Sequence, residues 1–100
     1  MSHEYTLIVN SGPAEGREDE YNDWYDNIHL PEFVALPGVI SGRRFKVVAG
    51  GKPTYSAIYE LTEDPDKVMG AMNEGIRNGT VHMSDALDIT SVSITMLEPR

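Results

Sequence analysis

The side chains best suited to acid–base chemistry in this chain are its histidines and tyrosines, because cysteine is absent. His29 is the first candidate, since an imidazole with an ordinary pKa of about 6.5 can take a proton from a phenol or an acidic carbon near neutral pH. Asp26 and Glu32 lie three residues to either side and are placed to orient it. The alternative is a helix-end histidine that caps carbonyls or pairs with those same carboxylates.

Four tyrosines form the second signal. Tyr5, Tyr55 and Tyr59 fall on one face of their predicted strands, and Tyr25 can join them from the first helix. A buried phenol needs a hydrogen-bond partner, and a bound carbonyl or enolate oxygen can supply it in an apolar pocket. Such a lining suits an aromatic or polyketide-like ligand. The alternative is that the rings fill the core and their hydroxyls reach solvent at its rim.

The methionines allow the same two interpretations. Met69, Met72 and Met83 are either core residues or the adaptable wall of a ligand cavity. His82 precedes Ser84 and two aspartates, but this spacing is typical of a capping turn, and the chain has no G-x-S-x-G nucleophile motif.

Other chemistries have little support. The three histidines are far apart and form no H-E-x-x-H pair, so we predict no metal site. The chain has no G-x-G-x-x-G motif, and we predict no cofactor. One predicted strand carries three cationic residues close together, Arg43, Arg44 and Lys46, with Phe45 between the last two. We expect them to pair with the acidic helix or a partner subunit, or Arg44 to hold a substrate carboxylate.

Composition restricts the partners. Sixteen acidic residues against eight basic ones give a formal net charge of -8, which argues against nucleic acid and anionic membranes as partners. An apolar fraction of 40% excludes a disordered acidic tail. The sequence shows neither a signal-peptide pattern nor an apolar run long enough to span a membrane. We therefore expect a single cytoplasmic domain over residues 1–100.

The elements that must position these side chains follow from periodicity. Residues 5–10, 39–48, 54–61 and 91–97 are predicted strands, and the turn at 49–53 joins the middle two. A helix is predicted from Arg17, with apolar residues at 21, 24, 25 and 28, and Pro31 is expected to end or kink it before a turn at 32–36. A second helix runs from Asp64 to about Asn78. This βαββαβ order predicts a ferredoxin-like α+β fold, a four-stranded antiparallel sheet with both helices on one face.

The two faces of that sheet differ in composition. The rows predicted to lie under the helices are apolar: Tyr5, Leu7 and Val9; Tyr55, Ala57, Tyr59 and Leu61; Val92, Ile94 and Met96. The opposite rows are rich in hydroxyl groups and poor in charge, which suits neither a core nor a solvated surface. We predict that a second copy covers this face, giving a homodimer with a barrel-like core.

Four runs in the sequence resemble the EthD-like branch of the dimeric α+β barrel superfamily. They are EDEYNDWYDNIHLPE at 18–32, LPGV at 36–39, RRF at 43–45 and MSDALD at 83–88. The resemblance implies the ferredoxin-like fold and the dimer. Relatives include cofactor-free monooxygenases, polyketide and lactone cyclases or isomerases, haem-binding enzymes and members without assigned activity.

The resemblance also implies a place for the site. The pocket of such domains lies between sheet and helices, with a first-helix histidine at its mouth, the position of His29. Relatives of the olivetolic-acid-cyclase type use a late histidine near the region of His82. Haem-degrading relatives carry a tryptophan on the second helix, where this chain has methionines, and no haem is assigned.

We therefore predict a small cofactor-independent enzyme that acts by proton transfer on an aromatic or polyketide/lactone-like molecule, as an isomerase, cyclase or monooxygenase. His29 is the predicted acid/base, and Trp24, Tyr25 and Tyr59 are expected to stack on the substrate and polarise its oxygen. The predicted substrate-binding residues are Tyr5, Tyr25, Tyr55, Met72, His82 and Met83. The alternative is a non-catalytic homodimer that binds a hydrophobic small molecule or serves as an accessory protein.

Overall fold

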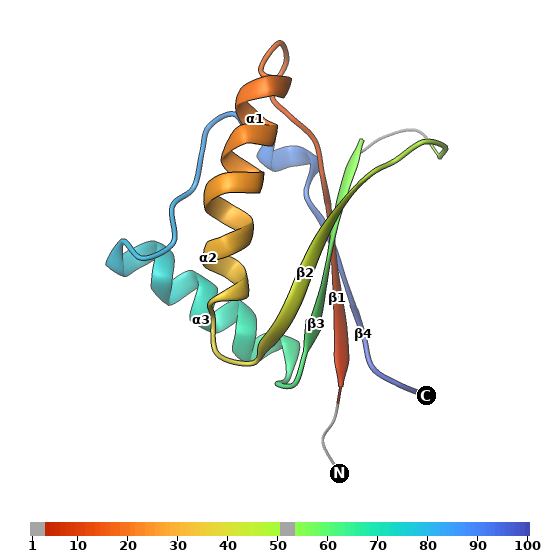
Figure 1. Ribbon diagram of the computed structural model, residues 1–100, viewed down its shortest axis with the longest axis vertical. Coiled ribbons are helices and arrows are strands. Elements are labelled where there is room, and N and C mark those ends of the chain that lie inside the picture. The colour runs from red at the N-terminus through yellow and green to blue at the C-terminus, as the bar shows by residue number, and fades with distance from the viewer. Residues whose placement is uncertain (1–3, 51–53) are drawn as a thin grey trace.

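The computed structural model describes residues 4–50 and 54–100. Its elements in chain order are β1 (Tyr5–Ser11), α1 (Glu18–Trp24), the π-helical turn η1 (Tyr25–His29), α2 (Leu30–Val34), β2 (Val39–Lys46), β3 (Tyr55–Leu61), α3 (Pro65–Asn78), the 3-10 turn η2 (Ile89–Ser91) and β4 (Ser93–Leu97). The strands form one antiparallel sheet in the order β2-β3-β1-β4, and the helices cover one face of it (Figure 1). The predicted ferredoxin-like α+β fold is confirmed.

The strands keep the register that their alternation predicts. In the middle of the sheet, Leu7 lies opposite Tyr59 on one side and Met96 on the other. β2 and β3 form the predicted hairpin, pairing from Lys46 and Tyr55 outward. The turn predicted at 49–53 falls partly on residues 51–53, outside the described residues.

The helix predicted from Asp64 to about Asn78 is α3, and it begins and ends as expected because neighbouring residues determine both ends. The Asp64 carboxylate accepts a hydrogen bond from the Asp66 backbone N–H at 2.8 Å, and Pro65 occupies the first turn, where its missing N–H costs nothing. Gly79 ends the helix with φ of 85°, a left-handed conformation that favours glycine.

The first helix departs from the prediction at Pro31, which does not end it. The Leu30 N–H donates to the Tyr25 carbonyl five residues back, the spacing of a π-helical turn, and α2 then continues to Val34. A wider turn accommodates the ring and the missing N–H of proline. The turn predicted at 32–36 is therefore wrong for residues 32–34, which are helical, whereas residues 35–36 do lie in a turn.

The π-helical turn changes which side chains face the sheet. Ile28 was expected in the apolar stripe, yet it is 42% exposed, whereas His29 is only 7% exposed. The added residue per turn moves the inward position from 28 to 29, so that Tyr21, Tyr25 and His29 follow one another at intervals of four. The polar group, not the apolar one, is carried into the interior.

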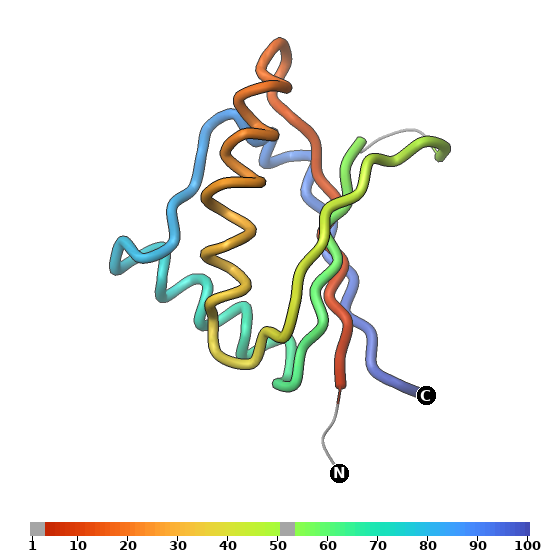
Figure 2. Tube along the Cα trace, in the orientation of Figure 1, coloured from red at the N-terminus to blue at the C-terminus, as the bar shows by residue number. Residues whose placement is uncertain are grey.

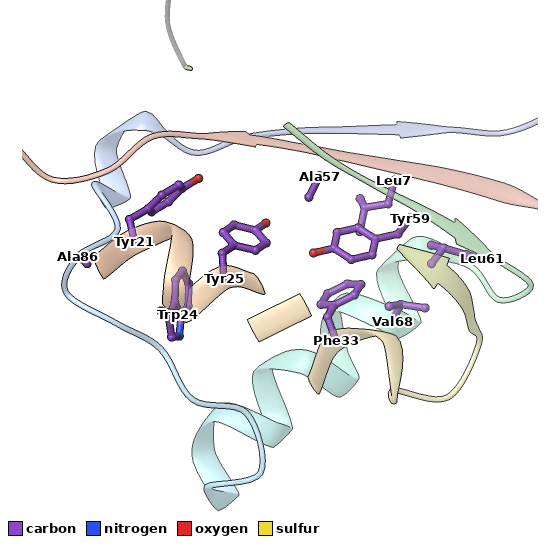
Figure 3. Packing of buried hydrophobic residues seen from close by; sticks show 10 residues of the cluster. All are labelled: Leu7, Tyr21, Trp24, Tyr25, Phe33, Ala57, Tyr59, Leu61, Val68 and Ala86. Carbon is purple, nitrogen blue, oxygen red and sulfur yellow. The ribbon is translucent and has the colours of Figure 1, made fainter. Parts of the chain in front are cut away.

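The core lies between the helices and the central strands (Figure 3). Tyr21, Tyr59, Phe33, Leu7 and Leu61 are its largest fully buried members. The edge strand β4 is different, because the helices do not close over it: Ile94 faces the helices as predicted, but it and Met96 are more than two fifths exposed.

Residues 80–92, here called the connecting segment, lead from α3 to β4 along the outer side of α1 (Figure 2). Backbone hydrogen bonds tie this segment to the loop after β1: Ala14 N–H donates to Ala86 O at 2.6 Å, and Asp88 N–H donates to Gly12 O at 3.0 Å. Arg17 adds hydrogen bonds to the carbonyl and carboxylate of Asp85. Capping turns at Ser84 and Asp88 account for the polar residues after His82. These hydrogen bonds therefore hold the connecting segment against the loop after β1 and the start of α1.

Candidate functional site

A cavity of about 220 Å³ lies between the first helix, α3, the connecting segment and the β1–β4 half of the sheet. Its walls are mainly aromatic rings, methionines and branched aliphatic side chains. Met72 and Met83, both predicted to bind a ligand, line it, as do Trp24, Tyr25 and Tyr59. The cavity is therefore an apolar compartment with few polar groups, which is the usual character of a small-molecule site.

A wider hollow of about 590 Å³ lies among the loops at the end of β1. It is open to solvent, and its lining includes Glu15, Glu18 and Asp88; among the described residues, no histidine, lysine or arginine belongs to that lining. Nothing in it matches the predicted chemistry.

His29 lines the cavity and is enclosed by rings. Its imidazole stacks on the Trp24 indole at a centroid distance of 4.7 Å, with an interplanar angle of 22°, and meets the Tyr25 ring edge-on at 5.0 Å. Within the described parts of the chain, its buried Nδ1 has no hydrogen-bond partner. Burial lowers the pKa of His29 to about 4. The imidazole is therefore neutral near pH 7, not a group that is half protonated there.

The two carboxylates expected to orient His29 are engaged elsewhere. Asp26 Oδ1 accepts a hydrogen bond from Arg44 at 2.8 Å. The two Glu32 oxygens contact His82, one accepting from its backbone N–H at 2.8 Å and the other lying 2.6 Å from its Nδ1. Although partial burial opposes it, these His82 hydrogen bonds lower the pKa of Glu32. The predicted pairing of Asp26 or Glu32 with His29 is therefore wrong: Glu32 pairs with His82 and Asp26 with Arg44, and His29 lies in the cavity wall.

Tyr59 supplies the second unpartnered polar atom. Its ring packs on Phe33 at 4.3 Å, and its hydroxyl turns toward that of Tyr25 (Figure 3). The buried hydroxyl makes no hydrogen bond of ordinary geometry among the described residues, its polar neighbour being the Tyr25 hydroxyl, and burial raises the pKa of Tyr59. Gly42 on β2 makes room for this ring, because an added Cβ would lie 2.7 Å from it. The hydroxyl can donate to an oxygen placed in the cavity.

Trp24 contributes its ring but not its N–H. The indole Nε1 donates to the His82 carbonyl at 3.0 Å, which ties the connecting segment to α1. Since that donor is already used, the predicted polarisation of a ligand oxygen falls to the tyrosines. The face of Trp24 remains as a stacking surface beside His29.

Three predicted binding residues lie outside the cavity lining. Tyr5 lies near Pro65 and Met96, at the far end of β1. The Tyr55 hydroxyl donates to Glu18 at 2.7 Å and accepts from the Asn22 amide. His82 is an exposed partner of Glu32. Of the nine side chains predicted for the site, the structure brings the other six together: Trp24, Tyr25, His29, Tyr59, Met72 and Met83.

Several lining residues were not selected from the sequence. Phe33 was assigned to a turn, because Pro31 was expected to stop the helix. Val9 and Ile94 were predicted to face the helices, and that alternation was the signal that could have placed them in the cavity wall. Leu87 and Ile89 lie on the connecting segment, whose path has no local sequence signal.

Arg44 occupies a ring-lined site on the β2–β3 side of the first helix. Its guanidinium carbon lies 4.3 Å from the centroid of the Tyr25 ring, 5.3 Å from Tyr21 and 5.2 Å from Tyr55. We call this arrangement the arginine cage. The side chain is 11% exposed, Nη1 is bound to Asp26, and Nε and Nη2 are buried without hydrogen-bond partners in the described part of the chain. The predicted pairing with the acidic helix is confirmed for Arg44.

Across residues 4–50 and 54–100, no three histidine or carboxylate side chains gather into a group able to hold a metal ion. The helices of the same residues include none with the length and apolar character that crossing a bilayer requires.

Comparison with known proteins identifies the fold. No family model matches the sequence, and no curated protein matches it. Among solved structures, a proposed monooxygenase from Shewanella loihica PV-4 superposes with a TM-score of 0.67 at 14% identity, covering 97% of this chain and 94% of that one.

An EthD-family protein from Bacillus halodurans C-125 also superposes with a TM-score of 0.67, at 16% identity, covering 98% of this chain and 99% of that one. At such identities the likeness concerns the backbone. The chain has the EthD-like, ferredoxin-like α+β fold that these two proteins share.

Proposed function

We propose that this protein is a small cofactor-independent enzyme that moves a proton on an aromatic, cyclic-ketone or lactone-like molecule bound in the 220 Å³ cavity. One observation carries the proposal: an otherwise apolar cavity contains two buried polar groups, His29 Nδ1 and the Tyr59 hydroxyl, that make no hydrogen bond of ordinary geometry among the described residues. Leaving such groups unpaired costs about 1–3 kcal/mol each, which a ligand that offers an acceptor oxygen to the Tyr59 hydroxyl and a proton to His29 would recover. Six of the nine side chains predicted from the sequence lie around this space.

The size of the cavity limits the ligand. A dry cavity of about 150 Å³ holds a benzene molecule, so 220 Å³ suits one ring with substituents or two small fused rings. The stacked pair of Trp24 and His29 offers a flat wall, and Met72 and Met83 can adapt to the ligand's outline.

The step that this arrangement supports is proton abstraction next to a carbonyl. Neutral His29 accepts the proton from the carbon, the carbon–hydrogen electron pair moves toward the carbonyl, and the oxygen becomes an enolate. The Tyr59 hydroxyl donates a hydrogen bond to that oxygen as its charge develops. Return of the proton to another carbon is an isomerisation, and attack of the enolate on a second carbonyl is a cyclisation.

The second part of the proposal is a homodimer formed through the open face of the sheet. Ile8, Ile58, Thr6 and Ser56 are only half-exposed there in a single chain, and Phe45 adds a partly exposed ring. A second copy would bury this face against its equivalent. Light scattering at several concentrations should give twice the chain mass of 11.1 kDa; a species of the single-chain mass at micromolar concentration contradicts the dimer.

The catalytic proposal is tested by α-proton exchange of 2-tetralone, a two-ring ketone, followed by proton NMR in deuterated buffer. The wild-type protein should accelerate exchange, and His29→Gln should abolish the acceleration. His82→Gln is the matched control, because His82 is exposed and outside the cavity lining. Equal rates for wild type and His29→Gln would remove His29 from the mechanism.

The alternative function is binding without catalysis. The observation that favours it is the lowered pKa of His29, about 4, since a weaker base has less driving force to take a proton from carbon. A non-catalytic protein would bind 2-tetralone, which NMR line broadening detects, and leave its exchange rate unchanged in wild type and variants.

A further inference from the structure

We propose that Arg44 is a specificity-determining residue that makes the cavity prefer the ionised form of weakly acidic ring compounds, the phenolates and enolates. The inference rests on the proposed function in one respect, since it requires the cavity to bind a ring compound. It adds a charge preference that the apolar lining does not suggest.

The arginine cage and the cavity share one wall. Arg44 extends from β2, at one edge of the sheet, whereas the cavity lies on the β1–β4 side. Tyr25 contacts both, because its ring lies 4.3 Å from the guanidinium carbon and also lines the cavity. One aromatic ring therefore separates a ligand from a buried cation.

The charge of Arg44 is only partly compensated. Asp26 binds Nη1, but its side chain is 57% exposed, so water screens its charge, while Arg44 is 11% exposed. The other two guanidinium nitrogens make no hydrogen bond of ordinary geometry among the described residues and lie among aromatic rings, where the guanidinium also interacts with the Tyr21 hydroxyl. Since ring faces do not neutralise a cation, Arg44 contributes a positive potential at the shared wall, which the Glu32 carboxylate opposes at His29.

The groups around the cavity already respond to this charge. Burial is the largest influence on the pKa of Tyr25 and of Tyr59 and raises both, and the Arg44 charge opposes the rise. Burial also dominates the lowered pKa of His29; the Glu32 carboxylate opposes that lowering, and the Arg44 charge, the smallest of the three influences, acts in the same direction as burial. The cation thus favours negative charge and disfavours positive charge at the cavity wall.

Two effects compete on a bound acid. Transfer from water into an apolar cavity disfavours the anion, while the Arg44 charge and a hydrogen bond from Tyr59 favour it. Their balance fixes the ligand's pKa in the complex. Changing Arg44 alone isolates its contribution, because the lining and the Tyr59 donor remain.

The probe is 4-nitrophenol, whose phenolate absorbs visible light and whose ionisation lies near neutral pH. Its pKa in the complex is measured by absorbance titration at saturating protein. 4-Nitrotoluene, which replaces the hydroxyl with a methyl group and cannot ionise, reports binding that does not depend on charge.

Arg44→Met removes the charge and keeps an unbranched side chain of similar length in the cage. We expect it to raise the pKa of bound 4-nitrophenol by about one unit, a tenfold shift toward the neutral form, with unchanged affinity for 4-nitrotoluene. Arg43→Met is the matched control, because Arg43 is exposed beside Phe45. It makes the same change in net charge and should leave the pKa of the bound probe unchanged.

Asp26→Asn provides a test in the opposite direction at an exposed position. Without its carboxylate partner Arg44 is less compensated, so the pKa of the bound probe should fall by about half a unit. The matched control is Asp23→Asn, one turn earlier on the exposed side of the same helix. This pair remains informative if Arg44→Met does not fold.

Each result has a distinct meaning. Opposite shifts for Arg44→Met and Asp26→Asn, with neither control shifting, support the proposal. Binding of both probes with the same ionisation in all variants overturns the role of Arg44 and leaves the proposed function intact. Failure of wild-type protein to bind either probe overturns both.

Discussion

The two sides of the Tyr25 ring differ in the charge and the surroundings of their polar groups. On the cage side, Arg44 lies over aromatic faces, the Asp26 carboxylate binds it, and the Tyr55 hydroxyl has two hydrogen-bond partners. On the cavity side, a neutral imidazole and the Tyr59 hydroxyl face an apolar space without partners in the described chain. Buried polar atoms without hydrogen-bond partners in the described chain occur on both sides, since Arg44 Nε and Nη2 are two of them. What distinguishes the cavity side is that its unpartnered groups are neutral and face an apolar space.

The largest expected effect comes from removing the shared wall. Tyr25→Ala should lower the free energy of unfolding by about 3–5 kcal/mol, because the 3% exposed ring contacts both sides and leaves a void. Tyr25→Phe keeps the ring and should cost about 1 kcal/mol or less. Urea denaturation measures both. If the two variants lose equal stability, the ring is not the element that separates cage from cavity.

A smaller effect is expected from acid on the cavity side. The unfolded chain protonates His29 below about pH 6.5, whereas the folded chain does so only near pH 4. Between these values the unfolded state binds the additional proton, so stability should fall as the pH falls, by up to about 3 kcal/mol.

His29→Gln should lack this component, whereas His82→Gln should keep it. Denaturant titrations at pH 7, 5.5 and 4 measure the difference. Wild type and His29→Gln both keep the Glu32–His82 pair, whereas His82→Gln also removes a hydrogen bond that lowers the pKa of Glu32, so its acid dependence changes through Glu32 as well. An identical acid dependence in wild type and His29→Gln would show that His29 is not buried neutral.

The smallest expected effect concerns the stability of the cage. Arg44→Met should change the free energy of unfolding by less than about 1 kcal/mol, since an apolar side chain can replace a half-paired buried cation and Asp26 is free to hydrate. Arg44→Ala should cost about 2–3 kcal/mol through lost packing. A large loss in Arg44→Met, measured by urea denaturation, would indicate that the cage exists for stability.

Local signals in the sequence were sufficient to predict most of the fold. Alternation located the strands, and Asp64 with Gly79 bounded α3, because caps and turns depend on neighbouring residues. The π-helical turn was not predicted. The local signal for it is a proline, Pro31, within a stretch of helical apolar spacing. Such a proline can either end the helix or follow a π-helical turn, and the outcome depends on what the next helical turn packs against. Here Phe33, 2% exposed, joins the core.

Most residues of the site were predicted from the sequence, but the hydrogen-bond partners of the residues around it were not. His29, Tyr59 and the methionines were selected because their types and periodicity place them inside. Asp26 and Glu32 lie only three residues from His29, a spacing at which helical side chains can meet. Their actual partners are far along the chain: Arg44 is 18 residues from Asp26, and His82 is 50 residues from Glu32. Only the tertiary fold decides that the imidazole stays unpaired.

The most direct test of the proposed roles of His29 and Tyr59 is a crystal structure of the protein with 2-tetralone. The account predicts the ketone oxygen within hydrogen-bond distance of the Tyr59 hydroxyl, about 2.7 Å, and the α-carbon beside the His29 imidazole, with the ring against Trp24. A ligand bound in the wider hollow at the end of β1, with the cavity empty, would contradict this prediction. A ketone oxygen turned away from Tyr59 and His29 would contradict it as well.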